Sequence, residues 1–150
     1  MKTYHYQAPF GILSFQIQDQ ALIHISFQDL GINDEEDQLS IQIRKELDEY
    51  FMGQRKQFTI PISLDVTPFQ DSVYQALQSI PYGETRTYQE IAIQIHNSKA
   101  CRAVGNANHN NPIPIIIPCH RVMGVKGDLV GYAGGIATKQ YLVELEKKYL

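Results

Sequence analysis

The sequence lacks the features that mark several large classes of protein. Its 150 residues include two cysteines, too few for a disulfide framework or a cysteine-rich zinc site, and its histidines show no metal-ligand spacing. No hydrophobic run approaches the ~20 residues that span a membrane, and residues 1–6 form no apolar signal segment. We therefore expect no metal, no cofactor, no membrane partner and a location in the reducing cytoplasm.

An overall excess of positive charge, which is typical of proteins that bind nucleic acids, is also missing. The formal net charge is −3. Residues 1–67 carry 5 Lys or Arg and 10 Asp or Glu, a net of −5, whereas residues 68–150 carry 8 and 6, a net of +2. The second part of the chain is thus compatible with a surface that faces phosphate groups, although such an asymmetry is also typical of ordinary solvated surfaces.

The side chains best suited to catalysis lie together in one stretch of the sequence. Residues 115–122 read Ile-Ile-Ile-Pro-Cys-His-Arg-Val. The three isoleucines predict a short buried strand, and the proline, which has no backbone N–H, ends it. Cys119 follows directly, and the adjacent imidazole and guanidinium are expected to favour its nucleophilic thiolate. A cysteine that only packs is the common alternative, and we prefer that interpretation for Cys101, which lies in a pattern of small helical residues.

The first part of the chain, residues 1–65, predicts a small antiparallel sheet with one helix and shows no set of residues that suggests chemistry. Alternating apolar and polar residues indicate half-buried strands, and Asp19-Gln20 suits a two-residue hairpin turn. The expected strands are 4–8, 12–18, 21–27 and 58–62, and the expected helix is 39–52.

The second part, residues 66–150, predicts helices. Capping boxes at Thr67-Pro68-Phe69-Gln70 and at Thr87-Tyr88-Gln89-Glu90 open two of them. A third helix is expected from an N-cap at Ser98 to about residue 108, so that the second and third form a helix-turn-helix. The last helix runs from residue 136 to the C-terminus. In it Glu146 is either a surface charge or a carboxylate that orients an imidazole.

The third helix has an unusual surface. Gly105 in a helix interior costs about 1 kcal/mol relative to alanine, which favours a close approach by another molecule there. An ordinary solvated arginine at position 102 is the alternative. The expected buried face is Ala100, Ala103, Val104 and Ala107, and the expected outer face is Arg102, Gly105, Asn106 and His109.

Several motifs resemble one known family. They are Ile-Pro-Tyr-Gly at 80–83, Lys-Ala-Cys-Arg-Ala-Val-Gly-Asn-Ala at 99–107, Asn-Pro at 111–112, Ile-Pro-Cys-His-Arg-Val at 117–122 and Gly-Tyr-Ala-Gly-Gly at 131–135. Through them, residues 69–146 resemble the O6-alkylguanine-DNA alkyltransferases, the methylated-DNA–protein-cysteine methyltransferases. The resemblance implies an α+β fold with a ribonuclease-H-like domain (1–65) and a helical DNA-binding domain with a helix-turn-helix (66–150).

The activity that the resemblance implies is direct reversal of DNA alkylation. Cys119 would take an alkyl group from O6 of guanine, or from O4 of thymine, irreversibly and once per protein. His120 would accept the thiol proton through a water molecule, with Glu146 as its orienting partner. Tyr88 would donate to the guanine ring nitrogen, and Asn111 would hold the turn at the cysteine.

The implied partner is double-stranded DNA that contains O6-alkylguanine, bound by a monomer. Arg102 would enter the base stack in place of the extruded nucleotide. Backbone carbonyls of Cys119 and Val122 would read the exocyclic amine, and the Ala133 N–H would face O6. The DNA-binding residues would be Arg102, Ala103, Gly105, Asn106, Thr87 and Arg121, and the base pocket would include Val122, Tyr132 and Ala133.

The chain departs from the family pattern in places. The turn at His96-Asn97-Ser98 lacks the usual glycine and proline, so His96 is expected to need a positive φ or a different turn. Tyr74 stands where tryptophan is common, and the zinc ligands of some members are absent. Three other functions were weighed: a relative that binds alkylated DNA without transfer, a helix-turn-helix regulator and a Cys-His hydrolase. The Cys119–His120 pair and its glycine-rich surroundings argue against the first two, and the third lacks an oxyanion motif.

Overall fold

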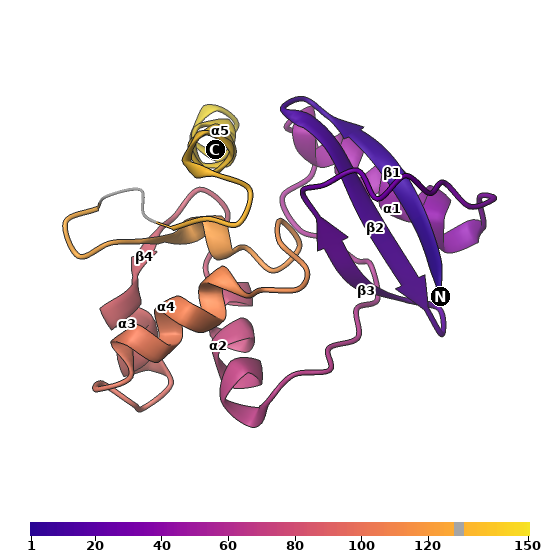
Figure 1. Cartoon of the computed structure of the whole chain (residues 1–150). Helices are drawn as coiled ribbons and strands as arrows, with labels where there is room; N and C mark the ends of the chain where they lie inside the picture. The colour runs from indigo at the N-terminus through magenta and orange to yellow at the C-terminus, as the bar shows by residue number, and fades with distance from the viewer. Residues whose placement is uncertain (128–130) are drawn as a thin grey trace. The chain divides into compact units, whose positions relative to one another are not determined.

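The computed structural model describes residues 1–127 and 131–150 (Figure 1). The chain divides into two compact units, Met1–Leu64 and Asp65–Leu150. An antiparallel sheet and one helix form the first unit, and helices dominate the second. The expected α+β class is confirmed.

The first unit is built on a three-stranded antiparallel sheet, in the order β1 (Lys2–Ala8), β2 (Gly11–Gln18) and β3 (Ala21–Ser26). The hairpin turn between β2 and β3 lies at Asp19 and Gln20, as predicted. Their φ values of 51° and 62° are the left-handed values that a two-residue turn requires.

Helix α1 (Gln38–Phe51) lies against one face of this sheet (Figure 1). It starts with a reciprocal cap, because the Asp37 side chain accepts from the Ser40 N–H and Ser40 Oγ accepts from the Asp37 N–H. Its buried side chains recur at helical spacing: Ile43, Leu47 and Tyr50. The predicted helix is confirmed within a residue at each end.

The strand expected at residues 58–62 is wrong. The segment makes a single bridge with β3, in which the Leu22 N–H donates to Pro61 O at 2.9 Å and the Ser63 N–H donates to Leu22 O at 3.0 Å. Pro61 has no N–H to donate and so cannot extend a ladder. The apolar alternation of this segment reflects burial rather than strand pairing.

The second unit contains the helices α2 (Pro68–Gln78), α3 (Tyr88–Gln94), α4 (Cys101–His109) and α5 (Ile136–Lys148). Both predicted capping boxes are present, with the Thr67 and Thr87 hydroxyls accepting from the N–H groups of Gln70 and Glu90. Helices α3 and α4 pack together across a short turn as the expected helix-turn-helix. Within the described part of the chain, no helix has the length and hydrophobicity needed to cross a membrane.

The turn between α3 and α4 differs from the expectation in one respect. Ser98 is not the N-cap; Ala100 occupies that position without a side-chain hydrogen bond, and the Ser98 carbonyl accepts from Gln89 Nε2 at 3.0 Å. His96 has φ 61°, the positive value expected for a turn without glycine. Helix α4 therefore begins two residues later than predicted, because the turn that contains the left-handed His96 takes up more residues.

The buried face of α4 also needs correction. Ala103 is exposed and Ala100, the N-cap, is only half-buried, whereas the buried side chains are Val104, Ala107 and Asn108. Successive helical residues are ~100° apart, so Ala103 lies well round the helix from Val104. The buried face of α4 therefore includes a polar amide, that of Asn108, which was not expected there.

The three isoleucines do not form a strand. Ile115 has φ 75°, a left-handed value that is unusual for a β-branched residue, and only an isolated bridge joins Pro114 and Ile117. The segment is a compact loop in which the Ile117 N–H donates to Ile113 O at 2.9 Å. Burial was predicted correctly for the apolar side chains at 115 and 117, but the backbone curls instead of extending.

Candidate active site

Two short parallel strands bring the cysteine and the helix-turn-helix together. The pair is β4 (Arg86–Thr87) and β5 (Val122–Met123), with Thr87 opposite Met123. Cys119 starts the 3₁₀ turn η1 (Cys119–Arg121) just before β5, and Tyr88 starts α3 just after β4. Helix α5 packs against η1. Three elements distant in sequence thus surround the thiol.

Asn111 holds the loop that carries the cysteine. Its Nδ2 donates to Ile117 O at 2.8 Å, and its Oδ1 accepts from the Ile113 N–H at 3.0 Å. The left-handed Ile115 between these two contacts costs about 1–3 kcal/mol, so the loop needs such a clamp to keep its shape. Asn111 thus ties the two sides of this loop together.

Cys119 is buried, with 3% of its surface exposed. Burial raises the pKa of the thiol to about 11, although Asn111, Lys139 and Tyr132 each act to lower it. The expectation that neighbouring cations favour the thiolate is therefore wrong for the resting protein, because loss of solvation outweighs them. The thiol stays protonated at neutral pH and needs a proton acceptor to become a nucleophile.

His120 and Glu146 form the pair that can supply such an acceptor. His120 Nε2 lies 2.6 Å from Glu146 Oε2, and both side chains are buried. Burial lowers the pKa of His120, although Glu146 acts to raise it, so the imidazole is neutral and able to take a proton. Glu146 is thus a buried partner of the imidazole and not a surface charge.

Arg121, expected among the DNA-binding residues, is buried, with 8% of its surface exposed. Its Nε donates to Glu146 Oε1 at 2.8 Å, its Nη2 to Oε2 at 3.1 Å, and its Nη1 to Ile80 O at 2.7 Å. The Gly83 N–H also donates to Glu146 Oε1, at 3.1 Å. Burial would raise the pKa of Glu146, but His120 and Arg121 hold it well below its usual range. The arginine keeps the orienting group ionised.

Tyr88 lies between α3 and α4, half-buried, with its ring over the backbone of Gly105. Burial raises the pKa of its hydroxyl, and the nearby Asn108 amide acts to lower it. A Cβ built on Gly105 would lie 3.9 Å from the tyrosine ring, which is ordinary contact. Packing inside this unit therefore does not require glycine there.

The outer face of α4 offers few large side chains. Arg102, Ala103 and Asn106 are exposed and Gly105 is half-exposed. Thr87 is half-buried, and its hydroxyl is committed to the cap of α3. One long cation therefore projects from a helix face that is otherwise small or short.

The expected pocket residues are divided between interior and surface. Val122 is fully buried and Tyr132 is 7% exposed, while Ala133 is exposed. Tyr132 lies near enough to the Cys119 thiol to lower its pKa. The Val122 carbonyl, expected to read the base, already accepts from Lys139 Nζ at 2.6 Å, which leaves it one further lone pair.

Sequence reasoning missed two buried polar residues at this site, Lys139 and Asn108. Burial lowers the pKa of Lys139 to about 8, and its charge acts on the Cys119 thiol. Lys139 precedes Glu146 by seven residues, two helical turns, and so lies on the same face of α5. That spacing is the signal that could have revealed the lysine.

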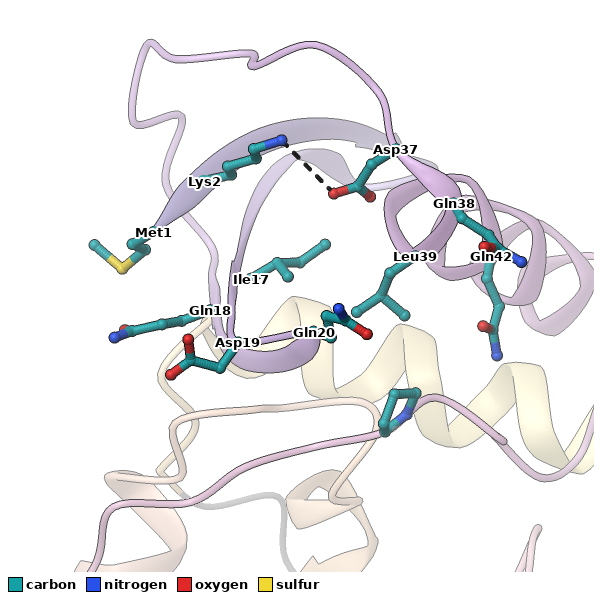
Figure 2. Close-up of a pocket in the computed structure, with 11 residues that line it drawn as sticks. Met1, Lys2, Ile17, Gln18, Asp19, Gln20, Asp37, Gln38, Leu39 and Gln42 are labelled. Carbon is teal, nitrogen blue, oxygen red and sulfur yellow. Dashed lines mark ion pairs between the residues drawn. The ribbon is translucent and has the colours of Figure 1, made fainter.

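A groove of about 720 Å³ lies elsewhere, in the first unit. Figure 2 shows it between the N-terminal strand, the β2–β3 turn and the start of α1, with Lys2 and Asp37 paired at 4.0 Å. Its lining has no thiol and no imidazole. In residues 1–127 and 131–150, no group of three or more His, Cys, Asp or Glu is placed to hold a metal ion. The chemistry therefore centres on Cys119.

A buried cysteine followed directly by a histidine that pairs with a carboxylate, in a unit that carries a helix-turn-helix, is typical of a DNA-binding protein class with a nucleophilic cysteine. Residues 68–148 match the family described as 6-O-methylguanine DNA methyltransferase, DNA binding domain. Residues 1–64 match the 6-O-methylguanine DNA methyltransferase, ribonuclease-like domain. The chain belongs to the 6-O-methylguanine DNA methyltransferase family.

Individual relatives agree with this assignment. A methylated-DNA–protein-cysteine methyltransferase of Methanosarcina acetivorans is 42% identical over 148 residues, which cover 94% of this chain and 95% of the relative. The crystal structure of Mycobacterium tuberculosis OGT in complex with DNA is 40% identical, with a TM-score of 0.91 and coverage of 99% and 94%. An O6-methylguanine DNA methyltransferase from Methanococcus jannaschii is 27% identical, with a TM-score of 0.72 and coverage of 95% and 92%.

Proposed function

We propose that this protein repairs alkylated DNA by direct reversal, moving an alkyl group from O6 of guanine to Cys119. The observation that carries the proposal is the buried Cys119 thiol, followed directly in the sequence by the neutral His120, whose imidazole lies 2.6 Å from the ionised Glu146. The M. acetivorans relative is named a methylated-DNA–protein-cysteine methyltransferase, and the M. tuberculosis relative was solved with DNA, which supports both the reaction and the partner.

The reaction proceeds by proton removal followed by displacement. His120 takes the thiol proton through a water molecule, and Glu146 stabilises the imidazolium that results. The Cys119 sulfur then attacks the alkyl carbon, forming an S–C bond as the C–O6 bond breaks. The electron pair passes to the guanine, whose ring nitrogen receives a hydrogen bond from the Tyr88 hydroxyl. The Lys139 ammonium favours the transient thiolate.

DNA enters along the outer face of α4. The small and short side chains there allow the helix to approach the minor groove, and Arg102 fills the stack once the damaged nucleotide has turned out. Ala103, Gly105 and Asn106 follow the same face, with Thr87 at the start of α3 nearby. O4-alkylthymine presents the same alkyl–oxygen bond and is a second substrate.

The Val122 carbonyl and the Ala133 N–H take the base-reading roles described above, and Tyr132 closes the pocket beside the thiol. The product is a thioether, which is a poor leaving group, so each protein acts once. Both cysteines are free, which fits action in a reducing cytoplasm. The acting form is expected to be a monomer.

The test is a titration of duplex containing labelled O6-methylguanine against a known amount of protein. Transfer should stop at about one methyl per protein, as a thioether forms once. The intact mass should rise by one methylene, and the label should lie on the peptide that contains Cys119. Many turnovers per protein would exclude this function and favour a hydrolase. Tight binding of the methylated duplex without a mass change would leave a binding protein that does not transfer.

A further inference from the structure

The carboxylate of Glu146 is shared between an imidazole and a guanidinium. Its Oε2 lies 2.6 Å from His120 Nε2 and accepts from Arg121 Nη2 at 3.1 Å, while its Oε1 accepts from Arg121 Nε at 2.8 Å. All three side chains are buried. The guanidinium therefore contacts both oxygens of the carboxylate that touches the proton acceptor, in surroundings where water does little to weaken the interaction.

A carboxylate this close to an imidazole affects the charge of the ring. An anion within ~4–6 Å of a histidine favours its charged form, and an imidazolium has no lone pair with which to accept the thiol proton. Glu146 on its own would therefore favour an imidazolium at His120, which is of no use as a base. The proposed function needs the opposite, a neutral ring.

Arg121 supplies positive charge to the same carboxylate. Because a guanidinium is always protonated, the Arg121–Glu146 pair has no net charge and attracts a proton onto His120 less strongly than the carboxylate alone. Burial lowers the pKa of His120, Glu146 acts to raise it, and Arg121 acts to lower it. Lys139, a cation on α5, acts in the same direction as Arg121, and the adjacent Cys119 thiol is uncharged at neutral pH.

The turn that carries the Ile-Pro-Tyr-Gly motif at 80–83 holds this pair in place. Ile80 O accepts from Arg121 Nη1 at 2.7 Å, and the Gly83 N–H donates to Glu146 Oε1 at 3.1 Å. Gly83 has φ 81°, a left-handed value that favours glycine. A lysine ammonium lacks the planar fork of donors and could not contact the carbonyl and both carboxylate oxygens in the same geometry. The motif thus fixes the guanidinium against the carboxylate.

We propose that Arg121 is a positioning residue for the proton acceptor. By pairing with both oxygens of Glu146, it keeps the carboxylate from charging the imidazole, so that His120 carries one proton, on Nε2, and accepts the thiol proton at Nδ1. An ionised carboxylate only accepts hydrogen bonds, which is why the Nε2 atom in contact with it carries the ring proton. This role rests on the proposed function, in which His120 takes the proton of Cys119.

The first test is the charge of His120 in the unaltered protein. Ring ¹⁵N chemical shifts distinguish an imidazolium from the two neutral forms, which carry the proton on Nε2 or on Nδ1. Comparison with His120→Gln identifies the signals. At pH 7 the ring should be neutral with its proton on Nε2. An imidazolium at pH 7, or a neutral ring protonated on Nδ1, would overturn the proposal.

The second test compares Arg121→Gln with a control, Arg55→Gln. Arg55 pairs with another buried carboxylate, that of Glu46 in the first unit. Transfer from labelled O6-methylguanine duplex is timed with protein in saturating excess between pH 6.5 and pH 8.5. Arg121→Gln should be about tenfold slower than the unaltered protein at pH 6.5, because His120 is then mostly protonated, and less than about threefold slower at pH 8.5. Arg55→Gln should match the unaltered protein throughout.

The dependence on pH separates this role from support of the fold. A loss of rate that is the same at every pH would make Arg121 structural and the proposal wrong, and so would no loss at all. Arg121→Gln leaves Glu146 without its cation and should lower the melting temperature. For that reason Arg121→Gln is also combined with Glu146→Gln, which removes the buried charge.

In that background there is no carboxylate to charge His120. Adding Arg121→Gln to Glu146→Gln should therefore change the rate by a factor that does not vary with pH. A factor that rose toward low pH, as in the single variant, would show that Arg121 does not act through Glu146.

These outcomes separate the two proposals. Absence of methyl on Cys119 in the unaltered protein would remove the proposed function itself. Normal methylation of Cys119 by a protein in which His120 is an imidazolium at pH 7 would remove only the role of Arg121.

Discussion

Glu46 in the first unit and Glu146 in the second are both buried carboxylates, with 3% and 1% of their surfaces exposed. Glu46 accepts from the Thr59 N–H at 2.7 Å, the Thr59 hydroxyl at 2.6 Å and Gln42 Nε2 at 3.0 Å. Burial would raise the pKa of Glu46, but these hydrogen bonds lower it. Both glutamates are therefore ionised inside the protein.

The two differ in their partners. The close partners of Glu46 are the neutral Thr59 and Gln42 groups and the guanidinium of Arg55, whose Nη1 lies 3.6 Å from Glu46 Oε1, so the carboxylate ties α1 to the segment that follows it. Glu146 instead contacts an imidazole next to a buried thiol. A buried charged group therefore does not indicate a functional site by itself. Glu146 differs from Glu46 because its partner, the His120 imidazole, can gain and lose a proton. The outcomes expected for variants, for pH and for the product test or sharpen this comparison.

The largest effect is expected at the nucleophile. Cys119→Ser should bind methylated duplex but abolish transfer, because a neutral hydroxyl is a poor nucleophile at this site. The control is Cys101→Ser, which should transfer at a near-normal rate. The measurement is methyl transferred per protein, by intact mass. Retained transfer in Cys119→Ser would move the acceptor to another residue.

The comparison itself is tested by amide substitutions at the two glutamates. Glu146→Gln should slow single-turnover transfer by about a hundredfold, since His120 loses its charged partner. It should also cost about 3–5 kcal/mol of unfolding free energy, because Arg121 is left as a buried unpaired charge.

Glu46→Gln should cost about 1–3 kcal/mol, from weakened buried hydrogen bonds, and leave the transfer rate unchanged. Urea unfolding and transfer kinetics measure the two properties separately. An equal loss of transfer in both variants would show that the glutamates act only through stability.

The next largest effect is expected on the extrusion of the damaged base from duplex DNA rather than on the alkyl transfer itself. Arg102→Ala should slow repair in duplex about ten- to a hundredfold, since extruding a base costs a few kcal/mol. Reaction with a free alkylguanine base should hardly change. Arg55→Ala, which breaks ion pairs with Glu46 and Glu49 in the first unit, is the matched arginine control and should affect neither substrate. Equal slowing of both substrates would make Arg102 structural.

A smaller effect is expected from pH. His120 acts as a base only when neutral, and burial lowers its pKa below the ordinary value of 6.5. Between pH 7 and pH 6 the transfer rate should therefore fall by less than the roughly threefold expected for a histidine with an unshifted pKa. A fall larger than threefold would mean that Glu146 holds the imidazole protonated.

The stability of the second unit should depend on pH in the same direction, with a lower stability at lower pH. At pH below 6.5 the unfolded His120 takes up a proton that the folded one refuses, and the lowered pKa of Glu146 adds a loss that begins below its ordinary value of 4.5. Unfolding free energy should therefore decrease as the pH falls, and Glu146→Gln should weaken that dependence.

The smallest effect is on the product. A methyl group on Cys119 enters a close-packed site, and overpacking costs about 1–3 kcal/mol. The methylated protein should therefore melt at a lower temperature than the free protein. Methylated Cys101→Ser should show the same shift. An unchanged or higher melting temperature would mean that the site has spare volume.

Short-range features of the fold could be predicted from the residues alone. The two threonine caps and the Asp19-Gln20 turn depend on residues within three positions of one another, so their patterns are visible in the sequence. The nucleophile was equally visible, because Cys119 and His120 are adjacent. The role of Glu146 was predicted only through the resemblance to a family, because no local sequence pattern distinguishes it from the other charged residues of α5.

Tertiary structure alone decided the environment of those residues. Arg121 was expected at DNA, yet it pairs with a carboxylate 25 positions away. Lys139 reaches the carbonyl of a residue 17 positions away, and Asn108 turns inward toward Cys119. The pKa of the thiol rises because it is buried. The sequence by itself determined which groups carry the chemistry; solvation and long-range pairing, which exist only once the chain has folded, determined their charge states and partners.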